Sequence, residues 1–581
     1  MQRVLSILFG AGFTITAAWG AGAILLRRMR LELDPLETVV FSFLSGAACL
    51  STAVFALCLI HQARPVVFLV VGAALIAGAV FRGPKAGKRL PRIPRLWTAL
   101  LIPTLTPFLI MYCIIALAPE VSPDGSGYHL GNVLRMLDAG GFVWDYHSMY
   151  SAFPQGVEML FLVAFAFGAH SAAALVHLAF FLCLPLLIVC YGRRYNMIPA
   201  SVFAATLVFT SPVFGLTASS AYNDAAVVTC SFAVFYCLNL LDDVLHNKVL
   251  ILCGIFTGYC FAVKYTGGVA AIFVVTWLLF RHRRVPWLAF TGSAAVCGGP
   301  WLLRNWVWLG NPVAPLLNRW FLNPYFSASF EKSYLADISH FEGLRHWWEF
   351  PLDLTLYGAH IPGFLGPVFL LAPFALLALR NSQGRRLLAA AAIFSLPIFF
   401  NAATRFLMPG MPFLALALGI ALQNSSGVLP LLAVAQAILC WPTVTPLYTA
   451  DWSWRIREIP VRAAFRLEPE ADFLRRRLPD YNLKPVIDQA VPVGAKIFSF
   501  STRPEAYLGR TILVGYESAE GNRIQDALLQ GRGALELKRQ KVGFVLVNDS
   551  DPIATEFKQN PTKLDVTALA ESHGTILYRV D

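Results

Sequence analysis

Long apolar segments alternate with short polar ones along the first three quarters of the chain. A membrane-spanning helix needs about 20 apolar residues, and by that measure the pattern predicts about fourteen spans. The shorter apolar piece 156–168 predicts a half-helix or an interfacial helix. The expected cores of the spans are 4–26, 36–60, 65–81, 97–118, 171–191, 198–216, 222–241, 249–263, 265–280, 286–309, 361–379, 387–401, 405–422 and 428–447.

Composition supports this interpretation. Of the 581 residues, 57% are hydrophobic and only 14% are charged. Soluble domains normally carry about 25% charged residues, so this chain cannot cover a water-facing surface of its size. We therefore expect a mainly α fold, a polytopic transmembrane helical bundle.

Basic residues outnumber acidic ones, with 46 Lys and Arg against 34 Asp and Glu. The bases gather in short loops between apolar segments, as the positive-inside rule predicts, so we expect no nucleic-acid partner. If the N-terminus lies outside, the seven short cytoplasmic loops hold about eighteen Lys or Arg, and the longer external connections hold fewer than about ten. The sequence therefore predicts a multi-pass protein whose N-terminus lies on the external side.

The composition changes near residue 448, where soluble-type sequence begins. Apolar runs at 496–500, 511–514 and 542–548 predict strands, and 522–540 and 565–571 predict helices. Strands that alternate with helices indicate a small α/β domain, which the topology places outside. We expect three regions: N-terminal helices in 1–96, a transmembrane core in 97–447 with external loops 119–155 and 310–360, and an external α/β domain in 448–581.

The stretch PEVSPDGSGYHL (119–130) follows the fourth predicted span and is expected on the outer face. Ser-Pro-Asp-Gly is a turn signature. The apolar residues that follow repeat at helical spacing and predict an amphipathic helix in the membrane interface. Asp124 would lie where this helix begins, either as a turn or helix-capping residue or as a functional acid.

Four more ionisable side chains lie in apolar sequence at the same predicted membrane depth. They are Asp224, Lys264, Arg304 and Arg405. Each has an ordinary explanation: Asp224 could cap a helix, Lys264 and Arg405 could reach the headgroups, and Arg304 could satisfy backbone carbonyls. An isolated charge near hydrocarbon costs about 2.5–3.5 kcal/mol, so a shared water-lined cavity explains the set better. Its charge pattern suits a carboxylate that moves a proton beside cations that hold a phosphate.

These motifs resemble the GT-C class of polytopic glycosyltransferases, in particular bacterial enzymes like the protein O-mannosyltransferases and the lipid A aminoarabinose transferase. The resemblance covers most of 97–447, and the first three spans precede it. The motifs that carry it are SPDGSGYHL, YNDAA, VKYTGG, GGPWLLRNWVWLGNPVAP and ATRFLMPGMP.

The resemblance implies an inverting hexosyl- or glycosyltransferase that takes a sugar from a polyprenyl-phosphate donor. The acceptor would be a lipid, a glycan or a protein on the outer face. Asp124 would be the catalytic base, and Asp224 would orient the acceptor, a basic group or a metal. Lys264 and Arg405 would bind the carrier phosphate, and Arg304 is a weaker candidate for the same role.

The resemblance also implies a location in the bacterial cytoplasmic (inner) membrane, among membrane lipids, with the N-terminus and the C-terminal domain on the periplasmic side. No cofactor is expected, and a divalent metal stays open, because Gly125 follows Asp124 where many relatives carry a second acid. Tyr128 and His129 are the next side chains able to bind substrate; His129 could hydrogen-bond the acid or the sugar, or have no special role. The C-terminal domain would recognise the acceptor or cap the cavity.

Three other functions compete with a glycosyltransferase. A transporter or flippase of lipid-linked saccharides would place its charges near mid-membrane and show two related halves, and no internal repeat is evident. An oligosaccharide polymerase or ligase also uses polyprenyl-linked sugars, but it normally relies on a large arginine-bearing external loop. A non-enzymatic envelope scaffold explains the embedded charges least well.

Overall fold

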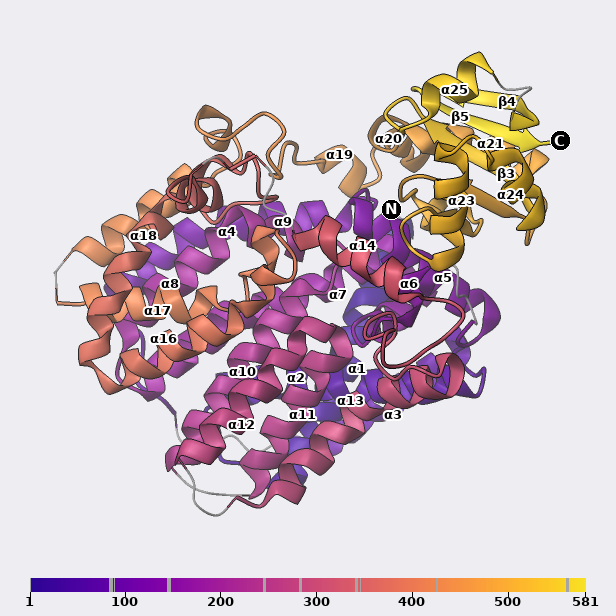
Figure 1. The fold of residues 1–581 in the computed structure, drawn as a ribbon. Helices are drawn as coiled ribbons and strands as arrows, with labels where there is room; N and C mark the ends of the chain where they lie inside the picture. The colour runs from indigo at the N-terminus through magenta and orange to yellow at the C-terminus, as the bar shows by residue number, and fades with distance from the viewer. Residues whose placement is uncertain are drawn as a thin grey trace.

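The computed structural model describes residues 2–82, 87, 89–143, 148–243, 247–281, 285–339, 343–344, 346–424, 427–560 and 564–581. Within these ranges the chain forms a large helical bundle, and its last part forms a small α/β domain at one end of the bundle (Figure 1). The predicted fold class is therefore confirmed. Parts of the predicted loops lie outside the described residues: 83–86, 88, 144–147, 244–246, 282–284, 340–342, 345 and 425–426.

The first four helices follow predicted spans. α1 and α2 pack closely because glycines face the partner backbone. A Cβ on Gly22 would lie 1.8 Å from the carbonyl oxygen of Ser42, and one on Gly46 would lie 1.7 Å from that of Ala18. Such close contact drives helix association in lipid, where burial of apolar surface contributes little. The bounds are α1 (Gln2–Met29), α2 (Pro35–Leu59), α3 (Pro65–Arg82) and α4 (Arg95–Leu117).

One long helix joins two predicted segments. α7 (Glu158–Arg194) contains all but the first two residues of the predicted short piece 156–168, and the whole predicted span 171–191. The two parts meet at Ala169, whose φ of 55° and ψ of −152° interrupt the helical backbone. The boundary expected from the sequence is therefore present as a break within one helix.

The remaining predicted spans also coincide with helices. The predicted span 198–216 is a pair, α8 (Ile198–Thr210) and α9 (Pro212–Ala218), bent by 63°. The others are α10 (Asp224–Asp243), α11 (Asn247–Val263), η2 (Tyr265–Gly268), α12 (Val269–Arg281), α13 (Trp287–Leu309), η4 (Pro367–Arg380), α16 (Ser382–Phe394), η5 (Leu396–Phe399), η6 (Thr404–Phe406), α17 (Met411–Leu422), α18 (Val428–Leu439) and η7 (Thr445–Leu447).

Short helices occupy the two long loops. The first loop (119–155) contains η1 (Gly125–His129), α5 (Leu130–Ala139) and α6 (Met149–Ala152). The helix expected after the Ser-Pro-Asp-Gly turn is thus confirmed as α5. The loop between α13 and η4 contains α14 (Ala328–Ser339), α15 (Glu349–Leu352) and η3 (Asp353–Tyr357).

Five of the described helices are long and apolar enough to cross a membrane: Gln2–Met29, Pro35–Leu59, Arg95–Leu117, Glu158–Arg194 and Asp224–Asp242. The bent pair α8 and α9 raises this number to six if it forms one span. Shorter apolar helices, among them α3, α11 and α17, lie in the same bundle (Figure 1). The chain is a multi-pass membrane protein, and the count of about fourteen spans stays a prediction.

The C-terminal domain is built on a five-stranded sheet in the order β2-β1-β3-β5-β4. β1 lies parallel to β2 and β3, and β5 lies antiparallel to β3 and β4. The strands are β1 (Lys496–Ser499), β2 (Ile512–Val514), β3 (Val542–Asn548), β4 (Val566–Ser572) and β5 (Thr575–Val580). The helices are α19 (Val461–Ala464), α20 (Glu470–Arg477), η8 (Pro479–Leu483), α21 (Lys484–Ala490), α22 (Glu505–Leu508), α23 (Ala519–Leu529), α24 (Gly533–Arg539) and α25 (Ala554–Gln559).

Most predicted elements of this domain are confirmed, and one is wrong. The three predicted strands are β1, β2 and β3, and the predicted helix 522–540 is divided between α23 and α24. The helix predicted over 565–571 is instead strand β4, which pairs with β5. His573 and Gly574 take positive φ values of 47° and 76° and form the tight turn between the two strands. Hairpin pairing therefore overrides the helix propensity of Ala, Leu and Glu.

The C-terminal domain contacts the first loop, and Figure 1 shows it beside α5 and α6. Ser148 Oγ donates a hydrogen bond to Glu517 Oε2 at 2.5 Å, and the Met149 amide donates to the Glu517 carbonyl at 2.8 Å. Arg135 Nη1 lies 2.5 Å from Glu505 Oε2. Polar contacts thus hold the sheet domain over the end of the bundle where the first loop lies.

Candidate active site

A cavity of about 1280 Å³ lies between the helix ends, the first loop and the C-terminal domain. Phe500 and Tyr516 of the C-terminal domain form part of its wall. The domain therefore caps the cavity, which is one of the two roles expected for it. Polar side chains that line the cavity include Asp124, Tyr128, His129, Tyr150, Glu158, Tyr222, Lys264 and Arg405.

Asp124 lies in the first helical turn of the loop, directly before η1. Its side chain makes no capping hydrogen bond to that helix, so helix capping does not explain the residue. Instead, Oδ2 of Asp124 accepts a hydrogen bond from Nη1 of Arg405 at 2.6 Å, across 281 residues of sequence. The structure thus joins the first and last motifs of the predicted set.

Glu120 fixes the two segments that carry the predicted acids. Its Oε1 accepts from the Ser122 amide at 2.7 Å, and its Oε2 accepts from the Ala221 amide at 2.5 Å. A Cβ on Gly125 would lie 2.8 Å from the Glu120 carboxyl carbon, so the chain can pass over this carboxylate only without a side chain. Glu120 therefore holds the loop of Asp124 against the turn before Asp224.

His177 of α7 supports that turn from the other side. Its Nδ1 lies 2.8 Å from the Ser220 carbonyl oxygen, and its Nε2 lies 3.0 Å from the Ala225 amide nitrogen. Because the amide can only donate, Nε2 accepts and Nδ1 carries the proton. The turn that begins α10 is therefore anchored at both ends.

Asp224 begins α10 and forms a second ion pair. Lys264 Nζ donates to Asp224 Oδ1 at 2.7 Å. Lys264 has an extended backbone (φ −161°, ψ 138°) and separates α11 from η2. Its side chain is 22% exposed against 7% for Asp224, so the cation is the more accessible partner.

Arg405 lies in the short helix η6, before α17. Its guanidinium carbon lies 5.6 Å from the Tyr222 ring centre and 5.9 Å from that of Trp454. Phe406 lies beside both cations, with its ring centre 4.5 Å from Lys264 Nζ and 5.4 Å from the Arg405 guanidinium carbon. Aromatic faces attract cations, so these rings hold the two basic groups at one side of the cavity.

The electrostatics of the first ion pair follow from this arrangement. Burial raises the pKa of Asp124, but the charges of Arg405 and His129 act in the opposite direction, and the net pKa is lowered from its usual value of 3.8. Burial lowers the pKa of Arg405, and the nearby Asp124 and Asp224 more than offset this, so the net pKa of Arg405 is raised. Both groups are therefore charged at neutral pH.

Tyr128 and His129 also line the cavity. Tyr128 stacks on Tyr150 with ring centres 3.6 Å apart and an interplanar angle of 4°. His129 Nδ1 lies 2.6 Å from Oε1 of Glu158, the first residue of α7. Sequence reasoning missed Glu158 and Tyr150. An acid within the apolar run after 156 was a usable signal for Glu158, and no sequence signal marks Tyr150.

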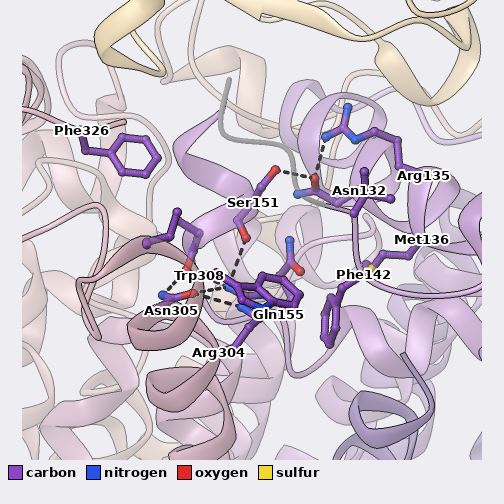
Figure 2. A pocket seen from close by; sticks show the side chains of 13 residues that line it. Asn132, Arg135, Met136, Phe142, Ser151, Gln155, Arg304, Asn305, Trp308 and Phe326 are labelled. Atoms are coloured by element: carbon purple, nitrogen blue, oxygen red, sulfur yellow. Dashed lines mark hydrogen bonds between the residues drawn. The ribbon is translucent and has the colours of Figure 1, made fainter. Parts of the chain in front are cut away.

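Arg304 lies apart from the two ion pairs, in the wall of a smaller pocket (Figure 2). Its Nη2 donates to the carbonyl oxygens of Ser151, Ala152 and Phe153 at 3.1, 2.9 and 3.3 Å. Asn305 strengthens the same anchor by donating to the Ala152 carbonyl at 2.7 Å. Arg304 is not among the residues that line the large cavity, and its contacts fit the alternative in which it satisfies backbone carbonyls.

No group of three or more His, Cys, Asp or Glu side chains in the described ranges is arranged to hold a metal ion. Asp124 and Asp224 each have a basic side chain as their close charged partner.

Comparison with known proteins identifies a family model and solved structures that resemble this chain. A family model described as dolichyl-phosphate-mannose-protein mannosyltransferase matches residues 159–302, a stretch that contains Asp224 and Lys264 but neither Asp124 nor Arg405. No curated protein sequence matches the chain.

Solved structures match over most of the chain. ArnT from Cupriavidus metallidurans in the apo state is 14% identical, with a TM-score of 0.52 over 83% of this chain and 98% of that chain. The same protein bound to undecaprenyl phosphate matches with a TM-score of 0.51, at the same identity and coverage. The archaeal oligosaccharyltransferase AglB from Archaeoglobus fulgidus, in complex with an inhibitory peptide and a dolichol-phosphate, is 13% identical over 84% of this chain and 74% of that chain, with a TM-score of 0.44.

At this level of identity the ArnT matches show the fold alone. The chain has an ArnT-like fold, and the resemblance to GT-C membrane glycosyltransferases is confirmed at the level of architecture.

Proposed function

We propose that this protein is an inverting glycosyltransferase that moves a sugar from a polyprenyl-phosphate donor to an acceptor hydroxyl. The observation that carries the proposal is the pairing of two carboxylates with two cations beside one large cavity, Asp124 with Arg405 and Asp224 with Lys264. A carboxylate can take a proton, and paired cations can hold a phosphate. The ArnT structure that shares this fold binds undecaprenyl phosphate, a carrier of the proposed class.

The exposed apolar part of the cavity wall supports a lipid-linked donor. Ile272 and Phe400 line it and are also 57% and 65% exposed. Ile272 lies on α12, within a predicted span, and apolar side chains exposed on a spanning helix face lipid, so this side of the cavity can admit a polyprenyl chain. The phosphate would then reach Arg405 and Lys264, whose positive charges favour an anion at that position.

The reaction follows from this placement. Asp124 takes the proton of the acceptor hydroxyl as its oxygen attacks the anomeric carbon of the sugar. The new carbon–oxygen bond forms as the bond between the anomeric carbon and the phosphate oxygen breaks, and the electron pair leaves on the phosphate. Attack from the face opposite the phosphate inverts the anomeric configuration. Arg405 and Lys264 stabilise the negative charge of the released polyprenyl phosphate, in the manner of an oxyanion hole.

The remaining predicted residues take supporting roles. Asp224 holds Lys264 and orients the acceptor, and Tyr128 forms part of the substrate wall. Arg304 anchors the segment 151–153 next to Tyr150 rather than binding phosphate. The acceptor, a lipid, glycan or protein, would arrive from the side covered by the C-terminal domain, which we place on the periplasmic face of a bacterial inner membrane.

The test uses the full-length protein in lipid nanodiscs. Undecaprenyl-phosphate sugars are supplied with an acceptor extract, and release of undecaprenyl phosphate is followed by mass spectrometry for wild type and for Asp124→Asn. We expect release by wild type and strongly reduced release by the variant. Equal release by both would exclude Asp124 as the base, and movement of intact donor across the bilayer without release would support a flippase instead.

A further inference from the structure

A second acid–base pair lines the same cavity, in addition to the two ion pairs of the proposed reaction. His129 and Glu158 are 4% and 2% exposed, and both line the cavity. They come from different elements, His129 from the end of η1 and Glu158 from the start of α7, and His129 Nδ1 lies 2.6 Å from Glu158 Oε1. The contact therefore ties the first loop to the bundle.

The second carboxylate oxygen of Glu158 is unusual. Oε2 is buried and has no hydrogen-bond partner among the described residues. A buried carboxylate oxygen without a donor costs free energy, more than a neutral group does. The fold retains this cost at the wall of a cavity large enough for a small molecule, which suggests that a donor group on a ligand completes the arrangement.

The chemistry of the pair limits what such a ligand can be. An ionised carboxylate only accepts hydrogen bonds, and Oε1 already has His129 Nδ1 as its partner. The ligand must therefore offer a donor to Oε2, and the phosphate of a carrier lipid offers none when ionised. Sugar hydroxyls are donors, and the rings of Tyr128 and Tyr222 lie near, with centres 4.3 and 5.9 Å from that of His129. Aromatic faces beside polar acceptors suit the mixed surface of a sugar ring.

We propose that the His129–Glu158 pair is a sugar-binding subsite, in which Glu158 Oε2 accepts a hydrogen bond from a sugar hydroxyl and His129 positions the carboxylate. The proposal deepens the function proposed above, because it assigns the part of the cavity that recognises the transferred sugar rather than the phosphate. Glu158 acts in binding and His129 acts through Glu158, and the proton of the acceptor hydroxyl is taken by Asp124.

The informative variant is Glu158→Gln. Glutamine keeps an oxygen for His129 and replaces the unpartnered oxygen with an NH₂ donor, so it reverses the hydrogen-bonding character of one position without changing the size of the side chain. Asp337→Asn is the matched control, since Asp337 also lines the cavity but is exposed. His129→Gln, which can still donate to Glu158, serves as a conservative second variant.

Three probes separate the two proposals. Binding of undecaprenyl phosphate tests the phosphate site and shows that each variant is folded. Binding of undecaprenyl-phosphate hexose tests the phosphate and sugar sites together. Binding of methyl hexosides, observed by saturation-transfer NMR, tests the sugar site alone. We expect Glu158→Gln to bind undecaprenyl phosphate like wild type, to bind the hexose-bearing lipid at least about tenfold more weakly, and to lose the methyl hexoside signal. Asp337→Asn should match wild type throughout, and His129→Gln should fall between wild type and Glu158→Gln.

The outcomes are distinguishable. If wild type binds no undecaprenyl phosphate, the proposed carrier is wrong, and the methyl hexoside comparison still tests the subsite. If the loss in Glu158→Gln appears with methyl hexosides only, the subsite binds an acceptor sugar, and its assignment to the transferred sugar is overturned. If Glu158→Gln binds both the hexose-bearing lipid and the methyl hexosides as wild type does, the pair has a purely structural role and the inference is overturned.

Discussion

Arg405 Nη1 lies 2.6 Å from Asp124 Oδ2, so the proposed base and a proposed phosphate ligand neutralise each other in this structure. Asp124 cannot accept a substrate proton efficiently while the guanidinium holds it, because the pair stabilises the ionised carboxylate. The phosphodiester of an arriving donor carries one negative charge, as the carboxylate does, and competes for the same guanidinium. Donor binding would therefore release Asp124 for proton transfer, which couples activation of the base to the presence of the donor.

Substitution of Asp124 should separate turnover from carrier binding. In Asp124→Asn the base is absent, and we expect sugar transfer to fall about 10²–10⁴-fold. The freed guanidinium of Arg405 should bind undecaprenyl phosphate about two- to fivefold more tightly, because an ion pair of this exposure is worth at most about 1 kcal/mol. Transfer rates and equilibrium binding in nanodiscs measure the two effects.

Asp138→Asn is the control for that experiment, since Asp138 is an exposed acid on the helix that follows Asp124. It should leave both quantities unchanged. A variant Asp124→Asn that loses carrier affinity together with turnover would contradict the competition between carboxylate and phosphate.

Loss of Arg405 should have the opposite effect on binding. Arg405→Gln removes a charged donor from the proposed phosphate site, and hydrogen bonds to charged groups are worth about 1.5–3 kcal/mol. We expect the Kd for undecaprenyl phosphate to rise about 10- to 100-fold. Arg457→Gln, at an exposed arginine whose guanidinium donates to the Asp451 carbonyl, should bind as wild type does. Unchanged binding by Arg405→Gln would remove Arg405 from the phosphate site.

The sequence alone predicted much of the bundle and the four residues that form the two ion pairs. Spans are visible because about 20 consecutive apolar residues are rare outside membranes. Charges stand out in them because each must be paired or face a cavity. Asp224 and Lys264 are 40 residues apart and Asp124 and Arg405 are 281 apart, yet all four could be singled out without knowledge of their partners.

Other features depend on contacts that the sequence does not display. The composition of β4 predicts a helix, but the segment forms a strand because it pairs with β5, which follows it after a tight turn. Arg304 was a weaker phosphate candidate than Arg405, with backbone carbonyls as the alternative partners, and the structure gives it three carbonyls of the first loop. The sequence left both roles open, because backbone acceptors leave no trace in side-chain patterns. The cavity wall supplied by Tyr516 arises from docking of the C-terminal domain, which local sequence does not encode.

Arg304 should matter for stability rather than for the carrier. Arg304→Met leaves the carbonyls of 151–153 without their donor, and we expect the free energy of unfolding to fall by about 2–4 kcal/mol. The Kd for undecaprenyl phosphate should stay within about twofold of wild type. Arg319→Met, at an exposed arginine that follows the same helix, should change neither quantity. A large loss of carrier affinity in Arg304→Met at unchanged thermal stability would instead support a direct role in phosphate binding.

The pKa of Glu517 predicts that the contact between the C-terminal domain and the first loop depends on pH. Burial raises its pKa to about 8, with a further contribution from the charge of Glu505, against a usual value of 4.5. The docked carboxyl therefore binds a proton between about pH 4.5 and 8, where the unfolded chain has lost it. This group stabilises the folded state most below pH 4.5, and its contribution decreases as the pH rises through 8.

Replacement of Glu517 by glutamine should remove that dependence, because glutamine resembles the protonated carboxyl and keeps an oxygen for Ser148. Thermal unfolding of wild type and Glu517→Gln at pH 5.5, 7 and 9 measures the effect, and the difference in Tm in favour of the variant should grow as the pH rises. Glu571→Gln, at an exposed acid on β4, controls for the general loss of one negative charge. If the difference in Tm between Glu517→Gln and wild type is the same at all three pH values, Glu517 is ionised in the folded protein, and the sheet domain docks without a proton at this contact.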